Sequence, residues 1–207
     1  FSKVIIGMSG GIDSALVATL AIDAFGSNNV SLVALPSKFN SQLSFKDAEN
    51  CANNLGVKLE VISIEPIFQQ MKLSLGDIFA SAKEDKTEEN IQSRIRGNIL
   101  MAISNKFNHL LLTTGNKSEM AVGYATIYGD MCGAFNPIKD LYKTQVFALA
   151  KWRNANMPPI SIYQKKALIP TSIINKEPSA ELNFNQKDSD SLPEYNILDQ
   201  ILFLLIE

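Results

Sequence analysis

The sequence has few of the residues that build metal centres and disulfide frameworks. Its 207 residues include two cysteines, Cys51 and Cys132, and one histidine, His109. Two cysteines make no disulfide scaffold, and free thiols in a reducing cytoplasm are the ordinary interpretation of such a count. A single histidine excludes multi-histidine metal sites and leaves one candidate for any histidine-dependent mechanism. We therefore expect a cytoplasmic protein with two structural thiols and no covalent staple.

Long apolar runs and an excess of positive charge are also missing. The longest apolar runs, such as residues 201–206, fall far short of the roughly 20 residues that cross a bilayer. The chain has 19 basic and 21 acidic side chains and a formal net charge of −2, whereas sequence-independent nucleic-acid binders carry a basic excess. A hydrophobic content of 46% with 19% charged residues is typical of a globular domain. We predict neither a membrane nor a nucleic-acid partner.

The length of the chain suits one domain, since domains usually have roughly 100–200 residues. The sequence starts at Phe1, without an initiating methionine, inside an apolar run, and it stops at Glu207 in a helical pattern. We see no internal repeat or boundary. We expect a single domain over residues 1–207, truncated at one or both termini.

Short apolar runs alternate with longer helical patterns through the first half of the chain. Strands are predicted at residues 4–6, 30–35, 58–62 and 110–112, and helices at 12–25, 44–55 and 87–107. Ser44, with Asp47 three residues later, has the spacing of a capping box that opens the second helix. Strands that alternate with helices indicate an α/β fold: a parallel twisted sheet with helices on both faces. Ligands of such sheets bind at the carboxyl ends of the strands.

The last third of the chain has a different pattern. Residues 144–154 predict a helix, and residues 170–192 are polar with few regular signals, which indicates a loop that covers another part of the molecule. Residues 196–206 have apolar side chains at helical spacing. We expect this final helix to pack on the sheet or on a partner.

The first strand runs into a glycine- and serine-rich loop before the first helix. Its residues are Gly7, Met8, Ser9, Gly10, Gly11, Ile12, Asp13 and Ser14. Glycines let the backbone turn sharply and expose its N–H groups, and the helix N-terminus adds a partial positive charge. Together these features predict a cradle for phosphate oxygens. An acid in such a cradle is explained by a Mg²⁺ ion, which favours one or two carboxylates together with substrate oxygens.

Three interpretations of this loop compete. It could be a turn needed only for packing, although two serines and Asp13 argue against that. It could be the nucleophile elbow of a serine hydrolase, because Gly7-x-Ser9-x-Gly11 matches that pattern. His109 would then be the base, but it precedes its strand and so lies at the opposite edge of a parallel sheet from Ser9. A nucleotide pyrophosphate loop fits better, although it lacks the Gly-Lys-Ser/Thr of ordinary P-loops.

A second polar segment, Thr113-Thr114-Gly115-Asn116-Lys117-Ser118-Glu119, follows the strand at residues 110–112. It therefore lies at the same sheet edge as the first loop. Thr114 can bond a nucleotide there. Glu119 can complete a metal site with Asp13, although a lone acid in a first helical turn more often just favours the helix dipole.

The loop Ser9-Gly-Gly-x-Asp13-Ser14 resembles the signature of N-type ATP pyrophosphatases. That superfamily has the Rossmann-like fold of the adenine nucleotide alpha hydrolases and releases pyrophosphate while ATP adenylates a substrate. Further separated segments resemble the NAD synthetase family in its glutamine-dependent type. They begin at Glu89, Ala121, Ile138, Lys176 and Gln186. The resemblance covers nearly the whole chain.

The resemblance implies a role for each matching residue. ATP would be bound by the loop Gly7–Ser14 together with Thr114, Lys143 and Ser179. Asp13 and Glu119 would hold Mg²⁺, and Asp13 and Lys143 would be catalytic. Residues that match deamido-NAD contacts are Asn90, Arg94, Glu119 and Lys187. The i, i+4 spacing of Asn90 and Arg94 independently predicts that they share a helix face.

The implied reaction is that of a C–N ligase. ATP adenylates the nicotinate carboxylate of deamido-NAD, and ammonia then displaces AMP to give NAD. The resemblance also implies a homodimer and a glutaminase domain, on the same or another chain, that supplies ammonia. One departure is Ile127, where ammonia-dependent members have a lysine; Lys187 could substitute for it. Another ATP-pyrophosphatase amidase or thiolase, and a non-catalytic nucleotide-binding module, stay open as alternatives.

Overall fold

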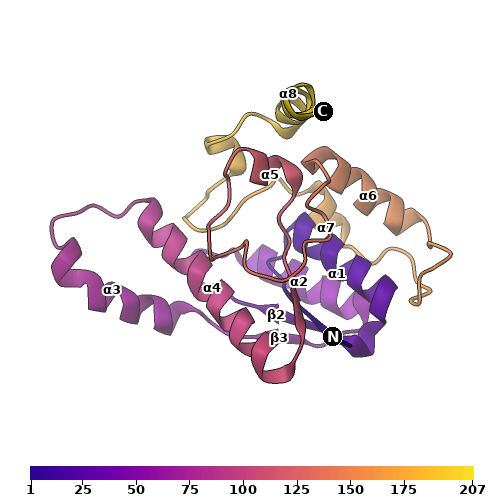
Figure 1. Cartoon of the computed structure of the whole chain (residues 1–207), viewed down its shortest axis with the longest axis horizontal. Coiled ribbons are helices and arrows are strands. Elements are labelled where there is room, and N and C mark those ends of the chain that lie inside the picture. Colours follow the sequence, from indigo (N-terminus) through magenta and orange to yellow (C-terminus); the bar gives the residue numbers. More distant parts are fainter.

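The computed structural model of the chain describes residues 1–207 and contains one parallel sheet. The sheet has four strands in the order β3-β2-β1-β4, all of them parallel (Figure 1). The strands are β1 (Val4–Gly7), β2 (Val30–Ala34), β3 (Leu59–Val61) and β4 (Leu110–Leu112). The order places β1 in the interior of the sheet, between β2 and β4, so its carboxyl end is flanked by two other strand ends. The predicted fold class is confirmed.

Side chains that alternate along the strands form a core on each face of the sheet. Ile6 and Leu32 belong to the larger core, together with residues of the helices α1, α2, α6 and α7. Ile5 and Leu111 belong to the smaller core, together with residues of α3 and α4. Because successive strand residues point to opposite faces, these continuous apolar strands require helices on both sides.

The helices agree with the predicted ranges, apart from one long helix that the sequence analysis missed and one short helix within residues 170–192. Their bounds are α1 (Ile12–Phe25), α2 (Gln42–Leu55), α3 (Glu65–Phe79), α4 (Lys86–Phe107), α5 (Lys117–Ala121), α6 (Lys143–Ala155), α7 (Thr171–Asn175) and α8 (Tyr195–Ile206). The missed helix, α3, carries only one buried side chain, Phe68, so its apolar pattern is weak. Within the polar segment 170–192, the structure has α7 and a short 3₁₀ helix, Asp188–Asp190.

The predicted N-cap of α2 was wrong by three residues. Ser41 caps this helix, because its hydroxyl accepts a hydrogen bond from the Ser44 N–H at 3.1 Å. Ser44 itself lies inside the first turn and is buried, and Asp47 bonds Ser172 rather than the start of the helix. Several serines in succession offer competing caps, and spacing alone selected the wrong one.

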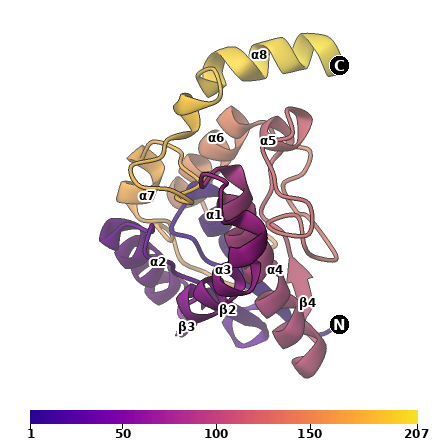
Figure 2. The ribbon, with the colours of Figure 1, turned by 90° about the vertical axis from the view of Figure 1, so that its left-hand side faces the viewer.

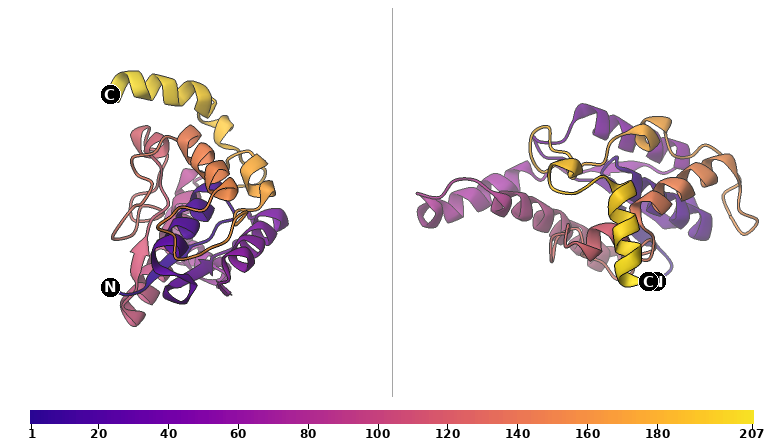
Figure 3. Two further views of the ribbon diagram at one scale, coloured as in Figure 1. Left: turned by 90° about the vertical axis from the view of Figure 1, so that its right-hand side faces the viewer. Right: turned by 90° about the horizontal axis from the view of Figure 1, so that it is seen from above.

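The last helix, α8, extends away from the sheet (Figures 2 and 3). It packs on α5 and α6 through Leu198 and Leu202, and its remaining apolar side chains are exposed. The predicted helix is therefore confirmed, but it packs on two helices and not on the sheet. No helix in the structure combines the length and the apolar character that crossing a membrane requires.

Candidate functional site

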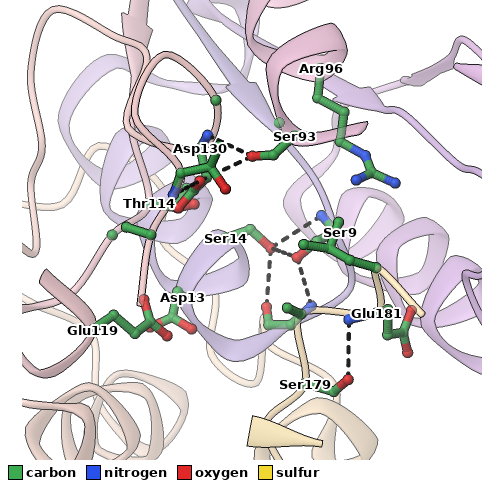
Figure 4. A pocket seen from close by; sticks show the side chains of 18 of the residues that line it. Ser9, Asp13, Ser14, Ser93, Arg96, Thr114, Glu119, Asp130, Ser179 and Glu181 are labelled. Atoms are coloured by element: carbon green, nitrogen blue, oxygen red, sulfur yellow. Dashed lines mark hydrogen bonds between the residues drawn. The ribbon is translucent and has the colours of Figure 1, made fainter. Parts of the chain in front are cut away.

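The two predicted loops meet at the carboxyl ends of β1 and β4. They line one cavity of about 550 Å³, within the usual range of ligand pockets. The cavity is also lined by the ends of β2, by one face of α4 and by the irregular segment after α7. Figure 4 shows side chains from these elements converging on it. The switch in strand order beside β1 opens this space, as expected for an α/β sheet.

The glycine-rich loop is shaped by contacts behind it. Gly10 has φ +80°, and a Cβ atom there would lie 2.0 Å from the Ser44 carbonyl oxygen, so only glycine fits. The Ser9 and Ser14 hydroxyl oxygens are 3.1 Å apart, and Ser9 Oγ accepts the Gly11 N–H at 3.2 Å. Gly11 begins α1 without a side-chain cap, which leaves N–H groups for a bound anion.

Seven of the eight loop residues line the cavity, all except Gly10, which faces α2. Two further predicted ATP contacts, Thr114 and Ser179, line it as well. The geometry therefore brings together the predicted phosphate cradle and the residues expected around it. Ser179 comes from the far end of the chain, which sequence spacing alone could not place here.

Lys143 joins two carboxylates in the wall of the cavity. Its ammonium Nζ lies 2.7 Å from Asp13 Oδ2 and 2.8 Å from Glu119 Oε1. Asn116 Nδ2 donates to the second oxygen of Asp13 at 2.9 Å. Lys143 is only 2% exposed, although it starts a helix. Figure 4 shows the Asp13 and Glu119 side chains next to each other. The predicted pairing of these two acids is thus present in space.

The electrostatics of this cluster follow from its burial. Burial and then the charge of Asp13 raise the pKa of Glu119 to about 7, although Lys143 opposes the shift. Burial disfavours the charged form of Lys143, but the two carboxylates outweigh it and raise its pKa. Two acids beside one cation leave an excess of negative charge, which an additional cation would neutralise.

The predicted deamido-NAD contacts divide into two groups. Asn90 and Glu119 line the cavity, and Asn90 Oδ1 accepts a hydrogen bond from Thr126 at 2.8 Å. Arg94 is exposed outside the cavity, where its Nε donates to the Ile127 carbonyl at 3.2 Å. Lys187 is also exposed and pairs with Glu177 at 2.8 Å. One chain therefore places only part of this group around the cavity.

The structure gives no support to a serine hydrolase. His109 precedes β4, at the opposite edge of the sheet from Ser9, and its Nδ1 lies 3.5 Å from Ser31 Oγ. Burial, followed by the charge of Asp47, raises the pKa of the Cys51 thiol to about 12, which leaves it unreactive. The burial of Cys51 is what a structural thiol requires.

Sequence reasoning left several charged residues of the cavity wall unassigned, among them Arg96 and Asp188. Burial lowers the pKa of Arg96 to about 10, and its guanidinium bonds Leu35 O, Ser37 Oγ and Asn40 Oδ1 without a carboxylate in contact. Asp188 is 5% exposed; its Oδ2 accepts from Tyr195, and its Oδ1 has no partner. The spacing of Arg96 from Asn90 and Ser93 on α4 was a usable signal. Asp188 had none.

Comparison with known proteins identifies relatives along the entire chain. The family model for NAD synthase matches residues 1–207. A glutamine-dependent NAD(+) synthetase of Xanthomonas campestris is 56% identical over the whole chain, which spans 36% of that protein. One of Rhodobacter capsulatus is likewise 56% identical, and the chain spans 38% of it. The chain thus covers little more than a third of these curated relatives.

Solved structures give the same result. Glutamine-dependent NAD+ synthetase from Acinetobacter baumannii, in complex with ADP, is 43% identical with a TM-score of 0.79, over 100% of this chain and 35% of that one. NMN synthetase from Francisella tularensis is 30% identical with a TM-score of 0.82, over 98% and 77% of the two chains. The fold and the sequence therefore point to the same relatives.

Proposed function

Because the chain belongs to the NAD synthase family, we propose that it is the synthetase domain of a glutamine-dependent NAD synthetase. In this proposal the domain adenylates deamido-NAD with ATP and amidates it with ammonia, which yields NAD, AMP and pyrophosphate. The curated relatives are nearly three times as long, which leaves room for a glutaminase domain that supplies the ammonia. A cytoplasmic location fits the free thiols Cys51 and Cys132.

One observation carries the proposal above the others. The cluster of Lys143, Asp13 and Glu119 lies beside the open N-terminus of α1, inside a cavity of nucleotide size. Adenylation brings an anionic carboxylate to an anionic triphosphate, so its barrier is largely electrostatic. The N–H groups of the cradle, the buried Lys143 ammonium and the proposed cation site would lower that barrier by neutralising negative charge.

The residues fit a Mg²⁺ ion that is completed by the substrate. No group of three or more acidic, histidine or cysteine side chains is close enough to hold a metal. Asp13 and Glu119 alone supply two carboxylates, the number that Mg²⁺ uses when phosphate oxygens and water fill its other positions. These two residues would hold the ion. When bound, it would supply charge neutralisation on the phosphate oxygens.

The first step needs positioning and charge stabilisation. An oxygen of the nicotinate carboxylate attacks the α-phosphorus of ATP, and the bond from that phosphorus to the bridging oxygen breaks, which releases pyrophosphate. The N–H groups at the start of α1, the Ser9 and Ser14 hydroxyls and the Lys143 ammonium would stabilise the leaving charge. Thr114 and Ser179 would hold the nucleotide from opposite sides of the cavity.

The second step also uses no protein nucleophile. Neutral ammonia attacks the acyl carbon, the C–O bond to AMP breaks, and the nitrogen loses a proton to solvent. Asn90 and Glu119 would orient the acyl group from the cavity wall. Arg94 and Lys187 would contact the part of deamido-NAD that extends beyond the cavity. We infer a homodimer in which these two exposed residues lie near the subunit boundary.

The test is a reconstituted reaction. We expect the chain, supplied with ATP, Mg²⁺, deamido-NAD and ammonium chloride, to form NAD, AMP and pyrophosphate in equal amounts. Chromatography resolves the three products. Replacing deamido-NAD by nicotinate mononucleotide should leave the reaction slow. Faster turnover of the mononucleotide would contradict the proposed substrate, and pyrophosphate release without any amide product would contradict the proposed reaction. Glutamine should replace ammonium only when a glutaminase domain is present.

A further inference from the structure

The segment that follows α7 carries predicted substrate residues but has almost no backbone support of its own. After Asn175 no helix or strand forms until the short 3₁₀ helix at Asp188. Ser179, the predicted ATP contact, lies in this interval. Something other than secondary structure must therefore hold its hydroxyl at the cavity.

Glu181 provides the main side-chain anchor of this segment. Its carboxylate accepts hydrogen bonds from Asn40 Nδ2 at 3.2 Å, from the Ser41 N–H at 3.4 Å and Oγ at 3.1 Å, and from Ser44 Oγ. Lys176 Nζ adds an ion pair at 3.6 Å. Burial would raise the pKa of Glu181, but these hydrogen bonds and the charge of Lys176 lower it instead. The anchor is therefore an ionised carboxylate.

The backbone of Glu181 links this anchor to Ser179. The Glu181 N–H donates to Ser179 Oγ at 3.1 Å. Glu181 adopts φ +49°, a left-handed conformation that non-glycine residues adopt only when their surroundings enforce it. The Ser179 hydroxyl also donates to the Gln186 carbonyl, so the backbone of Glu181 and that carbonyl together hold the hydroxyl, while the Glu181 side chain fixes the turn to α2.

The Glu181 carboxylate is connected to the nucleotide loop through the start of α2. The Glu181 carboxylate bonds the first turn of α2, and the Ser44 carbonyl of that turn presses against Gly10. Gly10 belongs to the proposed phosphate cradle. The start of α2 consequently connects the cradle on one side with the Ser179 turn on the other. Figure 4 shows Glu181 beside Ser9 and Ser179 at this side of the cavity.

We propose that Glu181 is a positioning residue for ATP, which holds the Ser179 turn and the glycine-rich loop in one rigid arrangement. The inference rests on the proposed function in so far as ATP is the ligand of that loop. Glu181 lies on the opposite side of the cavity from the Asp13–Glu119 pair, so it acts on nucleotide capture and not on the reacting atoms.

Glu181→Gln, which keeps the shape but removes the charge, tests this role. Hydrogen bonds to charged groups contribute about 1.5–3 kcal/mol, so we expect the KM for ATP to rise about tenfold or more. The kcat and the KM for deamido-NAD should change less than about twofold, and Glu181→Asp should restore part of the ATP affinity. Glu194→Gln, an exposed acid outside the cavity, is the matched control.

Calorimetric titration of ATP into the same proteins separates the two proposals. Weaker ATP binding in Glu181→Gln, with Glu194→Gln unchanged, supports the positioning role. Unchanged ATP affinity in Glu181→Gln, or an equal rise of the KM values for ATP and deamido-NAD, overturns the positioning role. The proposed function still stands in that case, provided that the wild type is active. A wild type that neither binds ATP nor makes NAD overturns both. If Glu181→Gln is too unstable to assay, Ser44→Ala, which removes one of the hydrogen-bond donors to Glu181 and leaves its carboxylate in place, must show the same selective loss.

Discussion

Two buried ion pairs join α1 to α6, one at each end of the helices, and they differ in how completely they are satisfied. The far pair lies near the carboxyl-terminal ends of the two helices, away from the cavity. There Arg153 binds Asp23 through Nε–Oδ2 at 2.6 Å and Nη2–Oδ1 at 2.7 Å. Its Nη1 donates to the Asn156 and Lys165 carbonyls, both at 3.0 Å. The near pair lies at the amino-terminal ends of the helices, beside the cavity. There the Lys143 ammonium is shared between Asp13 and Glu119, and all three residues line the cavity.

The comparison shows that burial and charge do not by themselves reveal a functional pair. The planar guanidinium of Arg153 makes two parallel hydrogen bonds to Asp23, and its other N–H groups donate to backbone oxygens. No donor of Arg153 therefore remains for a ligand. The ammonium of Lys143 is a point charge between two acids that both line the cavity, and Asn116 bonds the second oxygen of Asp13. The first pair holds the helices together, whereas the second lies where the proposed substrate and metal would bind.

The largest effect is expected at the cavity end. Asp13→Asn removes a proposed metal ligand but keeps the shape of the side chain. We expect NAD formation to fall by about 10³-fold or more, which corresponds to about 4 kcal/mol of transition-state stabilisation. Initial rates at saturating ATP and deamido-NAD measure the loss. Because Asp13 lies at the cavity surface, the melting temperature should stay within a few degrees of the wild type; near-normal turnover would break the proposed metal assignment.

The opposite result is expected at the far end. Asp23→Asn leaves the buried Arg153 charge without its counter-ion, which costs about 3 kcal/mol of unfolding free energy. For a chain of this size that lowers the melting temperature by about 6–12 °C, as differential scanning calorimetry would show. Activity per folded molecule should be kept, since Asp23 does not line the cavity. A stable but inactive variant would mean that the two pairs are not separate in function.

The sequence analysis singled out the residues of the near pair, although not their ion pairing, and none of the far pair, for a physical reason. Asp13 stands in a recognisable glycine-rich loop, so its chemistry was predicted from local pattern. Asp23 and Arg153 stand inside ordinary helices, where charged side chains are usually solvated. Their burial depends on how α1 packs against α6, which no local pattern encodes. Lys143 was assigned through family resemblance alone.

The elements of the fold likewise divide into those that a local sequence pattern predicts and those that depend on contacts distant in sequence. Strands and long helices with strong apolar periodicity were predicted almost to the residue, because local burial patterns specify them. The start of α2 was misplaced, and α3 was missed where its apolar pattern was weak. The turn around Ser179 depends on Glu181 reaching α2 across 137 residues of chain. Such contacts form only in the folded molecule, so the cavity wall could be predicted in part only.

A smaller effect is expected when Mg²⁺ is titrated against a variant of the near pair. Lys143→Met leaves Asp13 and Glu119 without their cation, so Mg²⁺ should bind the vacated pair more readily than in the wild type. At about ten times the dissociation constant, binding adds about 1.4 kcal/mol, or about 3–6 °C in melting temperature. Thermal scans with and without Mg²⁺ measure the difference. Lys151→Met, an exposed position on the same helix, should respond like the wild type. Equal shifts in all three proteins would argue against a cation site here.

The last effect is a pH dependence confined to the cavity end. Burial and the neighbouring Asp13 raise the pKa of Glu119 to about 7 from its ordinary 4.5. The folded chain therefore keeps a proton that the unfolded chain has lost over this interval, so the unfolding free energy falls as the pH rises from 4.5 to 7. The fall should be at most about 3 kcal/mol, since one pKa unit corresponds to about 1.4 kcal/mol. Urea titrations at pH 5 and pH 8 measure it. Glu119→Gln should flatten the slope, whereas Glu194→Gln should leave it unchanged. If the slope of unfolding free energy against pH persists in Glu119→Gln, the titrating group lies elsewhere. The near pair would then not differ from the far pair in its electrostatics.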